Sequence, residues 1–261
     1  MADFQCNGLL IDISGVVVEG KDRPIDGSLE AMARIEQSGV PYLFATNTTS
    51  RPRTEIAREL RSAGFAVSSE SRILTPFQVA QTICADKGLN PLCLVRKSVA
   101  AEIDTDPGRP YNAVVVGDLG DELTSHLLEE AFEAIHNGAV FLALAKNRDY
   151  VGPSGKLIPD MGLVVAGLEY STNSEATILG KPNALFFDAA LKLMGVVAGE
   201  CVMIGDDLEA DVIGAVSQGM HAVLVETGKF RAEWAAKAGE YGIAVAPNLK
   251  HALDLPLLSG L

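Results

Sequence analysis

Short runs of apolar residues alternate along this chain with segments in which apolar residues recur at helical spacing. The runs at 8–11 and 42–45 are typical of buried strands, because each is short, continuous and followed by polar residues. Between them, Leu29, Met32 and Ile35 recur every three residues, as they do along the buried face of a helix. This order of strand, helix and strand predicts an α/β protein with a largely parallel sheet.

The later part of the chain repeats this arrangement. The runs at 201–204 and 222–225 are predicted strands, and Val212, Ile213 and Val216 form the apolar face of a helix between them. These segments predict a compact βαβ unit.

The middle of the chain carries strand and helix signals of its own. Residues 114–116 and 141–144 are continuous apolar runs, separated by a segment with helical spacing. We therefore expect an inserted α/β domain at 77–172, within a core domain formed by residues 1–76 and 173–261. A chain of 261 residues is long enough for such a division.

The composition limits the partners of the chain. Its net charge of -13, from 34 acidic and 21 basic residues, argues against a nucleic-acid or anionic-membrane partner, because both bind clustered lysines and arginines. No apolar stretch reaches the roughly 18 residues that span a bilayer, and the N-terminus lacks the pattern of a signal peptide. The scattered cysteines have no paired spacing and are expected to be free thiols. These features predict a cytoplasmic protein.

Three of the predicted strands end in residues that can do chemistry. Asp12 follows the first strand, Thr46 and Asn47 follow the second, and Asp206 and Asp207 follow a later one. Because ligands bind outside the carboxyl ends of the strands in an open parallel sheet, we expect these residues to share one crevice.

The first two strand ends each have a chemical and a structural interpretation. The Asp12 carboxylate could attack phosphorus or bind a divalent cation, or it could only cap the turn at Gly15. Thr46 and Asn47 offer hydroxyl, amide and backbone N–H groups to phosphoryl oxygens. They could equally form the N-cap of a helix near Pro52.

An acidic cluster and a lysine are further candidates. Asp206, Asp207 and Asp211 lie near the start of a predicted helix, and Asp207 and Asp211 share a face if both are helical. An oxygen-lined Mg²⁺ site fits this cluster, and the alternative is that its acids stabilise the helix N-terminus. Lys181 precedes Pro182, which suits the first turn of a helix. Its ammonium could neutralise an anionic transition state or lie in solvent.

Taken in order, these segments resemble the four motifs of the haloacid dehalogenase superfamily. The motifs read Asp12-Ile13-Ser14-Gly15, Thr46-Asn47-Thr48-Thr49, Gly180-Lys181-Pro182 and Gly205-Asp206-Asp207. Their layout resembles the branch with a large α/β cap between motifs two and three, and the similarity covers nearly the whole chain. It implies a Rossmann-like core with a parallel sheet, an inserted cap, and a phosphatase of small phosphorylated substrates. Caps of this kind also suggest a homodimer.

The resemblance also implies roles for these residues. Asp12 would attack the substrate phosphorus and form an aspartyl-phosphate that water later hydrolyses. Mg²⁺ would be bound by Asp12, the backbone carbonyl of Ser14 and Asp206, with Asp207 or Asp211 supporting from nearby.

The remaining motif residues would bind substrate. Ser14, Thr46, Asn47 and Lys181 would surround the phosphoryl group together with the nucleophile, since the charge on its oxygens must be neutralised. The cap would close over the site and exclude water.

Ser14 departs from the pattern of most phosphatases of this superfamily, which carry a second aspartate two residues after the nucleophile. A hydroxyl lacks the proton affinity of a carboxylate, so general acid–base assistance worth about 10²–10⁴-fold is lost. We expect a slow phosphatase, or one that prefers good leaving groups, acting on phosphate ester, phosphoramidate or pyrophosphate bonds.

Three other functions compete with this interpretation. A dehalogenase would use the same aspartate on carbon, but it needs no metal and leaves the acidic cluster unexplained. A phosphate-binding or regulatory protein of low or no activity would have lost turnover along with the acid–base residue. A receiver-like phospho-acceptor module fits poorly with so large an insertion.

Overall fold

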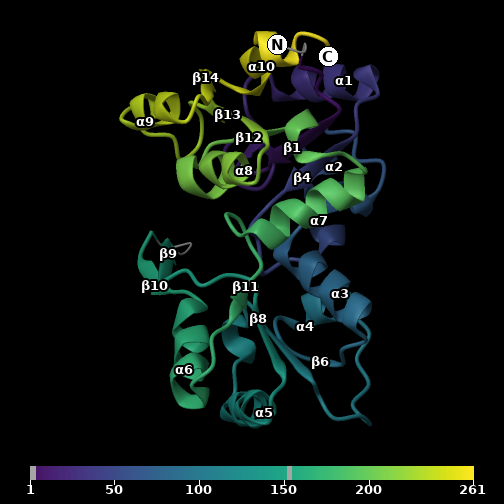
Figure 1. The fold of residues 1–261 in the computed structure, drawn as a ribbon, viewed down its shortest axis with the longest axis vertical. Coiled ribbons are helices and arrows are strands. Elements are labelled where there is room, and N and C mark those ends of the chain that lie inside the picture. Colours follow the sequence, from purple (N-terminus) through teal and green to yellow (C-terminus); the bar gives the residue numbers. More distant parts are fainter. Residues whose placement is uncertain (1–3, 152–154) are drawn as a thin grey trace. The chain divides into compact units, whose positions relative to one another are not determined.

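The computed structural model describes residues 4–151 and 155–261 of the chain. Its contacts divide the chain into two compact units, and Figure 1 labels most of their helices and strands. The first unit comprises Met1–Thr46, Arg53–Leu74 and Lys181–Leu261. The second unit comprises Asn47–Pro52 and Thr75–Gly180.

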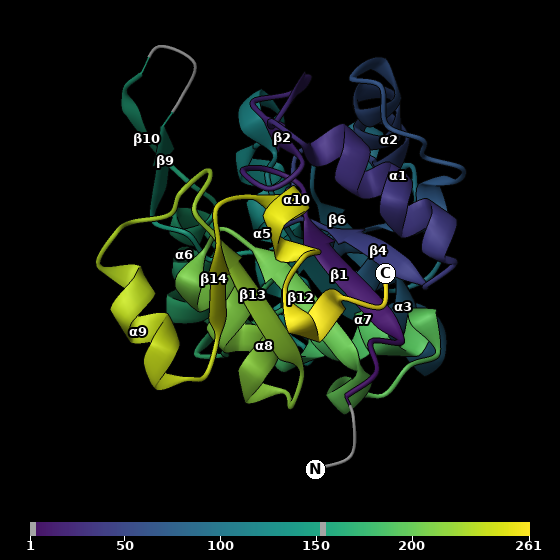
Figure 2. The ribbon, with the colours of Figure 1, turned by 90° about the horizontal axis from the view of Figure 1, so that it is seen from above.

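The first unit contains a parallel sheet with six strands among the described residues (Figure 2). In sheet order these are β14 (Ala244–Ala246), β13 (His221–Val225), β12 (Cys201–Gly205), β1 (Gly8–Asp12), β4 (Tyr42–Ala45) and β5 (Ile73–Leu74). β1 lies inside the sheet and pairs in parallel with both β12 and β4. The predicted parallel sheet is confirmed, and the strands expected at 8–11, 42–45, 201–204 and 222–225 are present within one residue.

Helices cover both faces of this sheet, with α1 and α10 on one face and α7 and α8 on the other (Figure 2). The helices of the first unit are α1 (Ser28–Ser38), α2 (Arg53–Ser62), α7 (Ala184–Met194), α8 (Gly214–Ser217), α9 (Trp234–Glu240) and α10 (Leu249–Ala252). Alternate strand residues point to opposite faces, so Leu9 and Ile11 pack in one buried cluster with α1, α2 and α10. Met32 and Ile35 of α1 belong to this cluster, whereas Leu29 is exposed.

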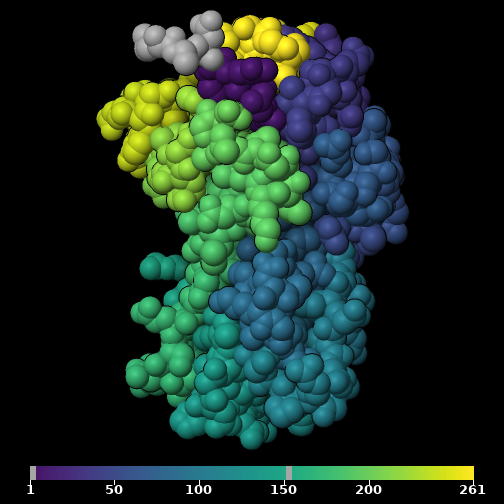
Figure 3. Space-filling model, turned by 45° about the vertical axis from the view of Figure 1, so that its right-hand side comes forward, coloured from purple at the N-terminus to yellow at the C-terminus, as the bar shows by residue number. Residues whose placement is uncertain are grey.

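The end of the chain packs beside α1, where Figure 3 shows the last residues in yellow. The guanidinium of Arg34 donates to the carbonyl oxygens of Leu253 and Leu261 at 3.1 and 2.8 Å. The short elements of the first unit are β2 (Val18–Glu19), β3 (Arg23–Pro24), η1 (Glu70–Arg72), η3 (Ala198–Glu200), the π-helix η4 (Leu208–Ile213) and η5 (Pro256–Leu258).

The second unit has a parallel sheet of its own, with four strands in the part of the chain that the structure describes. Its strands are β11 (Thr177–Ile178), β8 (Val140–Ala143), β7 (Ala113–Val116) and β6 (Pro91–Leu94), and a separate hairpin pairs β9 (Asp149–Val151) with β10 (Leu157–Pro159). Its helices are α3 (Pro76–Lys87), α4 (Lys97–Ala100), η2 (Gly120–Glu122), α5 (Ser125–His136) and α6 (Gly162–Thr172). Val114, Val116 and Phe141 pack against α5 and α6 in a buried cluster.

The limits of the second unit differ from the predicted limits of the inserted domain at 77 and 172. β11 pairs with β8, so residues 173–180 lie in the second unit, whereas the sequence assigned them to the core. A strand of two residues shows no period, and its sheet cannot be recognised from sequence alone. The assignment of the units to a core domain and a cap stays a prediction.

Two of the other sequence features can be compared with the structure. No helix among residues 4–151 and 155–261 is long and apolar enough to cross a membrane. Cys6, Cys84, Cys93 and Cys201 are free, as predicted. Burial raises the pKa of each thiol, which makes these cysteines poor nucleophiles.

Candidate active site

The carboxyl ends of β1, β4 and β12 lie side by side in the sheet of the first unit. Asp12 ends β1 and is in register with Ala45, the residue before Thr46. Ile11 is in register with Ile204 of β12, which leads through Gly205 to Asp206. The pairing of these strands therefore brings residues that are far apart in sequence to one edge of the sheet.

Three buried carboxylates gather at this edge. One carboxylate oxygen each of Asp12, Asp206 and Asp211 lies within 4.8 Å of the others. These residues are only 8%, 1% and 1% exposed, so water screens their mutual repulsion weakly. Such a cluster is costly to bury unless cations compensate its charge.

Lys181 lies between two members of this cluster. Its Nζ is 2.6 Å from Asp12 Oδ1 and 2.6 Å from Asp211 Oδ1, and the side chain is 2% exposed. Burial lowers the pKa of the ammonium, but the two carboxylates outweigh it and hold that pKa above its ordinary value. The lysine is therefore buried and protonated rather than solvated.

The chain enters α7 differently from the prediction. Asn183 is the N-cap, and its Oδ1 accepts a hydrogen bond from the Leu185 N–H at 3.0 Å. Pro182 therefore lies before the helix and not in its first turn. This cap sets where α7 begins, three residues after the lysine that enters the cluster.

The acidic cluster shifts the pKa values of its own members. Burial raises the pKa of Asp206 to about 6, although the hydrogen bond from the Lys229 N–H lowers this pKa. Burial also raises the pKa of Asp12. The positive charge of Lys181 lowers this pKa, and the negative charges of Asp211 and Asp206 raise it further. A bound cation would favour the ionised forms of both carboxylates.

Asp211 and Asp207 lie in different positions, although the prediction from sequence did not distinguish between them. Asp211 lies in the π-helix Leu208–Ile213, and its Oδ2 accepts the Asp207 N–H at 3.1 Å. Asp207 is the N-cap of that helix, with Oδ1 accepting the N–H groups of Glu209 and Ala210 at 3.2 and 3.0 Å. Asp207 thus precedes the helix, and only Asp211 joins the cluster of three.

Ser14 and Gly15 form the turn that follows Asp12. Gly15 has a φ of +91°, a left-handed conformation that glycine adopts readily. The Gly15 N–H donates to the Val18 carbonyl at 2.8 Å, and the Ser14 side chain is exposed. Cation binding by the Ser14 carbonyl stays a prediction.

Thr46 and Asn47 fall on opposite sides of the boundary between the two units. Thr46 is 5% exposed, and its N–H donates to the Leu74 carbonyl at 3.1 Å, which continues the pairing of β4 with β5. Asn47 belongs to the second unit, where its Oδ1 lies 2.9 Å from the point at which a Cβ on Gly180 would stand. Phosphoryl binding by Asn47 therefore stays a prediction.

Sequence reasoning missed the segment after β13. The Lys229 N–H donates to Asp206 Oδ2 at 2.7 Å, and the Lys229 ammonium is 3.1 Å from Asp207 Oδ2. Thr227 donates its hydroxyl hydrogen to the Gly15 carbonyl. The sequence contained a signal, because residues 226–229 are polar or glycine and directly follow a predicted strand.

Two family models match the chain. Residues 9–105 match the model described as haloacid dehalogenase-like hydrolase. Residues 178–252 match the model described as HAD-hydrolase-like. The two matches include every candidate residue named above.

Whole-chain relatives extend this result. Phospholysine phosphohistidine inorganic pyrophosphate phosphatase of Bos taurus is 38% identical over 96% of this chain and 94% of its own. Haloacid dehalogenase-like hydrolase domain-containing protein 2 of Bos taurus is 33% identical over 94% of each chain.

Solved structures share the fold. The p-nitrophenyl phosphatase from Archaeoglobus fulgidus superimposes with a TM-score of 0.84 over 96% of this chain and 99% of its own, at 24% identity. Glycerol phosphate phosphatase from Mycobacterium tuberculosis, solved in complex with magnesium, gives a TM-score of 0.79 at 26% identity over 95% of this chain and 76% of its own. Sequence identity over nearly whole chains, two matching family models and the shared α/β fold agree that this chain belongs to the haloacid dehalogenase-like hydrolases.

Proposed function

We propose that the chain is a Mg²⁺-dependent phosphatase that acts on a small phosphorylated molecule through an aspartyl-phosphate intermediate. The observation that carries this proposal is the buried cluster of Asp12, Asp206 and Asp211, in which the Lys181 ammonium contacts Asp12 and Asp211. It is supported by relatives that are named phosphatases and that match this chain along nearly their whole length.

The donor set of the cluster fits Mg²⁺. Three carboxylates within 4.8 Å offer the hard oxygen ligands that Mg²⁺ prefers, and a single lysine balances only one of their three charges. Asp12, Asp206 and the Ser14 carbonyl would hold the ion, with Asp211 supporting them. When bound, Mg²⁺ supplies positive charge that neutralises phosphoryl oxygens.

The residues of the chain then divide the chemistry between them. A carboxylate oxygen of Asp12 attacks phosphorus in line, its bond to phosphorus forms as the bond to the leaving group breaks, and water later hydrolyses the acyl phosphate. Lys181, held 2.6 Å from Asp12, is placed to stabilise charge on the transferring group. Thr46 and Asn47 would donate hydrogen bonds to the phosphoryl oxygens.

Phosphate release from p-nitrophenyl phosphate tests the proposal. We expect release that requires Mg²⁺, stops with a chelator and is absent in the Asp12→Asn variant. Halide release from a haloacid without metal would instead support a dehalogenase. Mg²⁺ or phosphate binding without any turnover would support a phosphate-binding protein.

Ser14 is proposed to shift the substrate preference towards good leaving groups, such as phosphoramidates, acyl phosphates or pyrophosphate. Because no carboxylate stands two residues after Asp12, wild type should hydrolyse a phosphoramidate far faster than a simple alkyl phosphate. The Ser14→Asp variant should raise kcat/KM for the alkyl phosphate by about 10²-fold, the lower end of general acid–base assistance. The same variant should change phosphoramidate hydrolysis much less. Equal turnover of both substrates by wild type would contradict this prediction.

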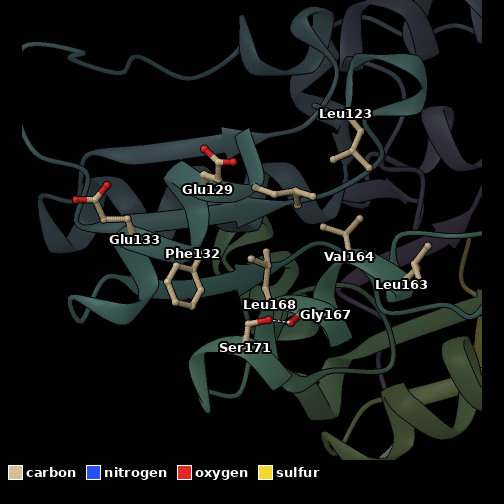
Figure 4. A pocket seen from close by; sticks show the side chains of 10 residues that line it. Leu123, Glu129, Phe132, Glu133, Leu163, Val164, Gly167, Leu168 and Ser171 are labelled. Atoms are coloured by element: carbon tan, nitrogen blue, oxygen red, sulfur yellow. Dashed lines mark hydrogen bonds between the residues drawn. The ribbon is translucent and has the colours of Figure 1, made fainter. Parts of the chain in front are cut away.

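We also propose that two copies pair through a groove between α5 and α6 of the second unit (Figure 4). The groove has a volume of about 710 Å³ and is lined by Leu123, Leu128, Glu129, Phe132, Glu133, Leu163, Val164, Gly167, Leu168 and Ser171. Leu163 is 68% exposed at this surface, and clustered exposed apolar side chains favour an interaction site.

A charged substitution in the groove should change the oligomeric state of the protein. The Leu163→Lys variant should be monomeric by light scattering, because a charge in the contact is costly to bury. The matched Leu193→Lys variant alters a similarly exposed leucine, 60%, in the first unit, and it should remain dimeric. A monomeric wild type would contradict the proposed dimer.

The cytoplasmic location also stays a prediction.

A further inference from the structure

The segment Thr227-Gly228-Lys229, here called the 227–229 segment, encloses one oxygen of the Asp206 carboxylate. The Lys229 N–H donates to Asp206 Oδ2 at 2.7 Å. The Lys229 side chain extends past this contact, and its Nζ is 3.1 Å from Asp207 Oδ2. The segment thus contacts two consecutive aspartates through one residue.

Gly15 and Gly228 leave no room for side chains around the same oxygen. A Cβ on Gly15 would lie 2.0 Å from Asp206 Oδ2 and 2.9 Å from Gly228 Cα. A Cβ on Gly228 would also lie 2.0 Å from Asp206 Oδ2 and 2.6 Å from Gly15 Cα. Both glycines have positive φ, +91° and +61°, so the backbones approach this carboxylate as only glycine allows.

A side-chain hydrogen bond joins the two backbones. The Thr227 hydroxyl donates to the Gly15 carbonyl, which connects the segment after β13 to the turn after β1. Asp206 Oδ2 therefore lies between two glycines with the Lys229 N–H directed at it. The carboxylate that joins Asp12 and Asp211 in the acidic cluster is therefore held by contacts from the 227–229 segment and from Gly15.

We propose that the 227–229 segment positions Asp206 for cation binding and thereby sets the Mg²⁺ affinity of the site. The inference deepens the proposed function and rests on it. A carboxylate already held in its binding orientation loses less conformational freedom when the ion binds. Mutation of the groups that hydrogen-bond a metal ligand typically lowers metal affinity or activity by about 10–100-fold. The segment itself contacts no reacting atom, so its residues are positioning residues.

Mg²⁺ binding to the substrate-free protein, measured by calorimetry, tests this proposal without any turnover. The Gly228→Ala variant should bind Mg²⁺ about 10–100-fold more weakly than wild type, because its Cβ displaces Asp206. The matched control is Gly242→Ala, whose φ of +69° imposes the same backbone strain while nothing lies within 4 Å of its Cβ. This control should bind Mg²⁺ as wild type does.

A second pair of variants covers the case in which Gly228→Ala does not fold. Thr227→Val removes the hydroxyl that reaches Gly15 and should weaken Mg²⁺ binding, and Thr227→Ser should restore it. Wild-type affinity in both Gly228→Ala and Thr227→Val would overturn the positioning role while leaving the phosphatase proposal intact. Absence of Mg²⁺ binding to wild type would overturn both proposals.

Discussion

The Asp12→Asn variant should release no phosphate from p-nitrophenyl phosphate above the uncatalysed rate. An amide of the same shape cannot attack phosphorus, and loss of a nucleophile commonly costs at least about 10⁴-fold in kcat. The substitution also removes one of three carboxylates that lie within 4.8 Å of each other. Folding should therefore survive, because less negative charge is buried and Lys181 keeps its contact with Asp211.

Rate and folding are measured together to separate these effects. Phosphate release at saturating Mg²⁺ gives the rate, and thermal unfolding gives the stability. Asp254→Asn is the matched control, since the Asp254 side chain is 59% exposed, pairs with Arg34 in the first unit and is no member of the cluster. Its activity should stay within about twofold of wild type, because an exposed ion pair contributes little. Retention of a few per cent of activity by Asp12→Asn would show that another group is the nucleophile.

The Lys181→Met variant should lose both stability and activity. Lys181 is 2% exposed and contacts Asp12 and Asp211 at 2.6 Å, so removing its charge leaves two buried carboxylates without their partner. Breaking a buried ion pair in this way costs about 3–5 kcal/mol in the free energy of unfolding. The loss of charge stabilisation should also lower kcat by about 10²–10³-fold.

Urea unfolding in a chelator, and then in Mg²⁺, checks the stability of Lys181→Met. Mg²⁺ should recover part of the lost stability, because a cation that binds only the folded cluster favours folding. Lys237→Met provides a matched control, since Lys237 is 45% exposed in its pair with Glu209 and such surface pairs contribute little. An unfolding midpoint in chelator equal to that of wild type would contradict the interpretation of Lys181 as the counter-charge of the cluster.

Much of the fold and of the candidate site could be predicted from sequence. The strands at 8–11 and 201–204 were found because a buried parallel strand is a continuous apolar run, which needs no knowledge of its neighbours. Asp12 and Asp206 followed from these strands, since a residue just past a strand must emerge at the sheet edge. Short strands such as β11 were missed because two residues carry no pattern.

The sequence by itself determined the order of the longer strands of the sheet, the resemblance to the family, and the residues that can do chemistry at the strand ends. Only the tertiary structure decided that Asp211 rather than Asp207 joins the cluster, because this depends on the residue at which the π-helix begins. It alone decided that Lys181 is buried and that the Lys229 N–H holds Asp206. The spacing of residues along a chain predicts which side chains share a face of one helix or strand. Contacts between residues far apart in sequence form only after the strands have paired.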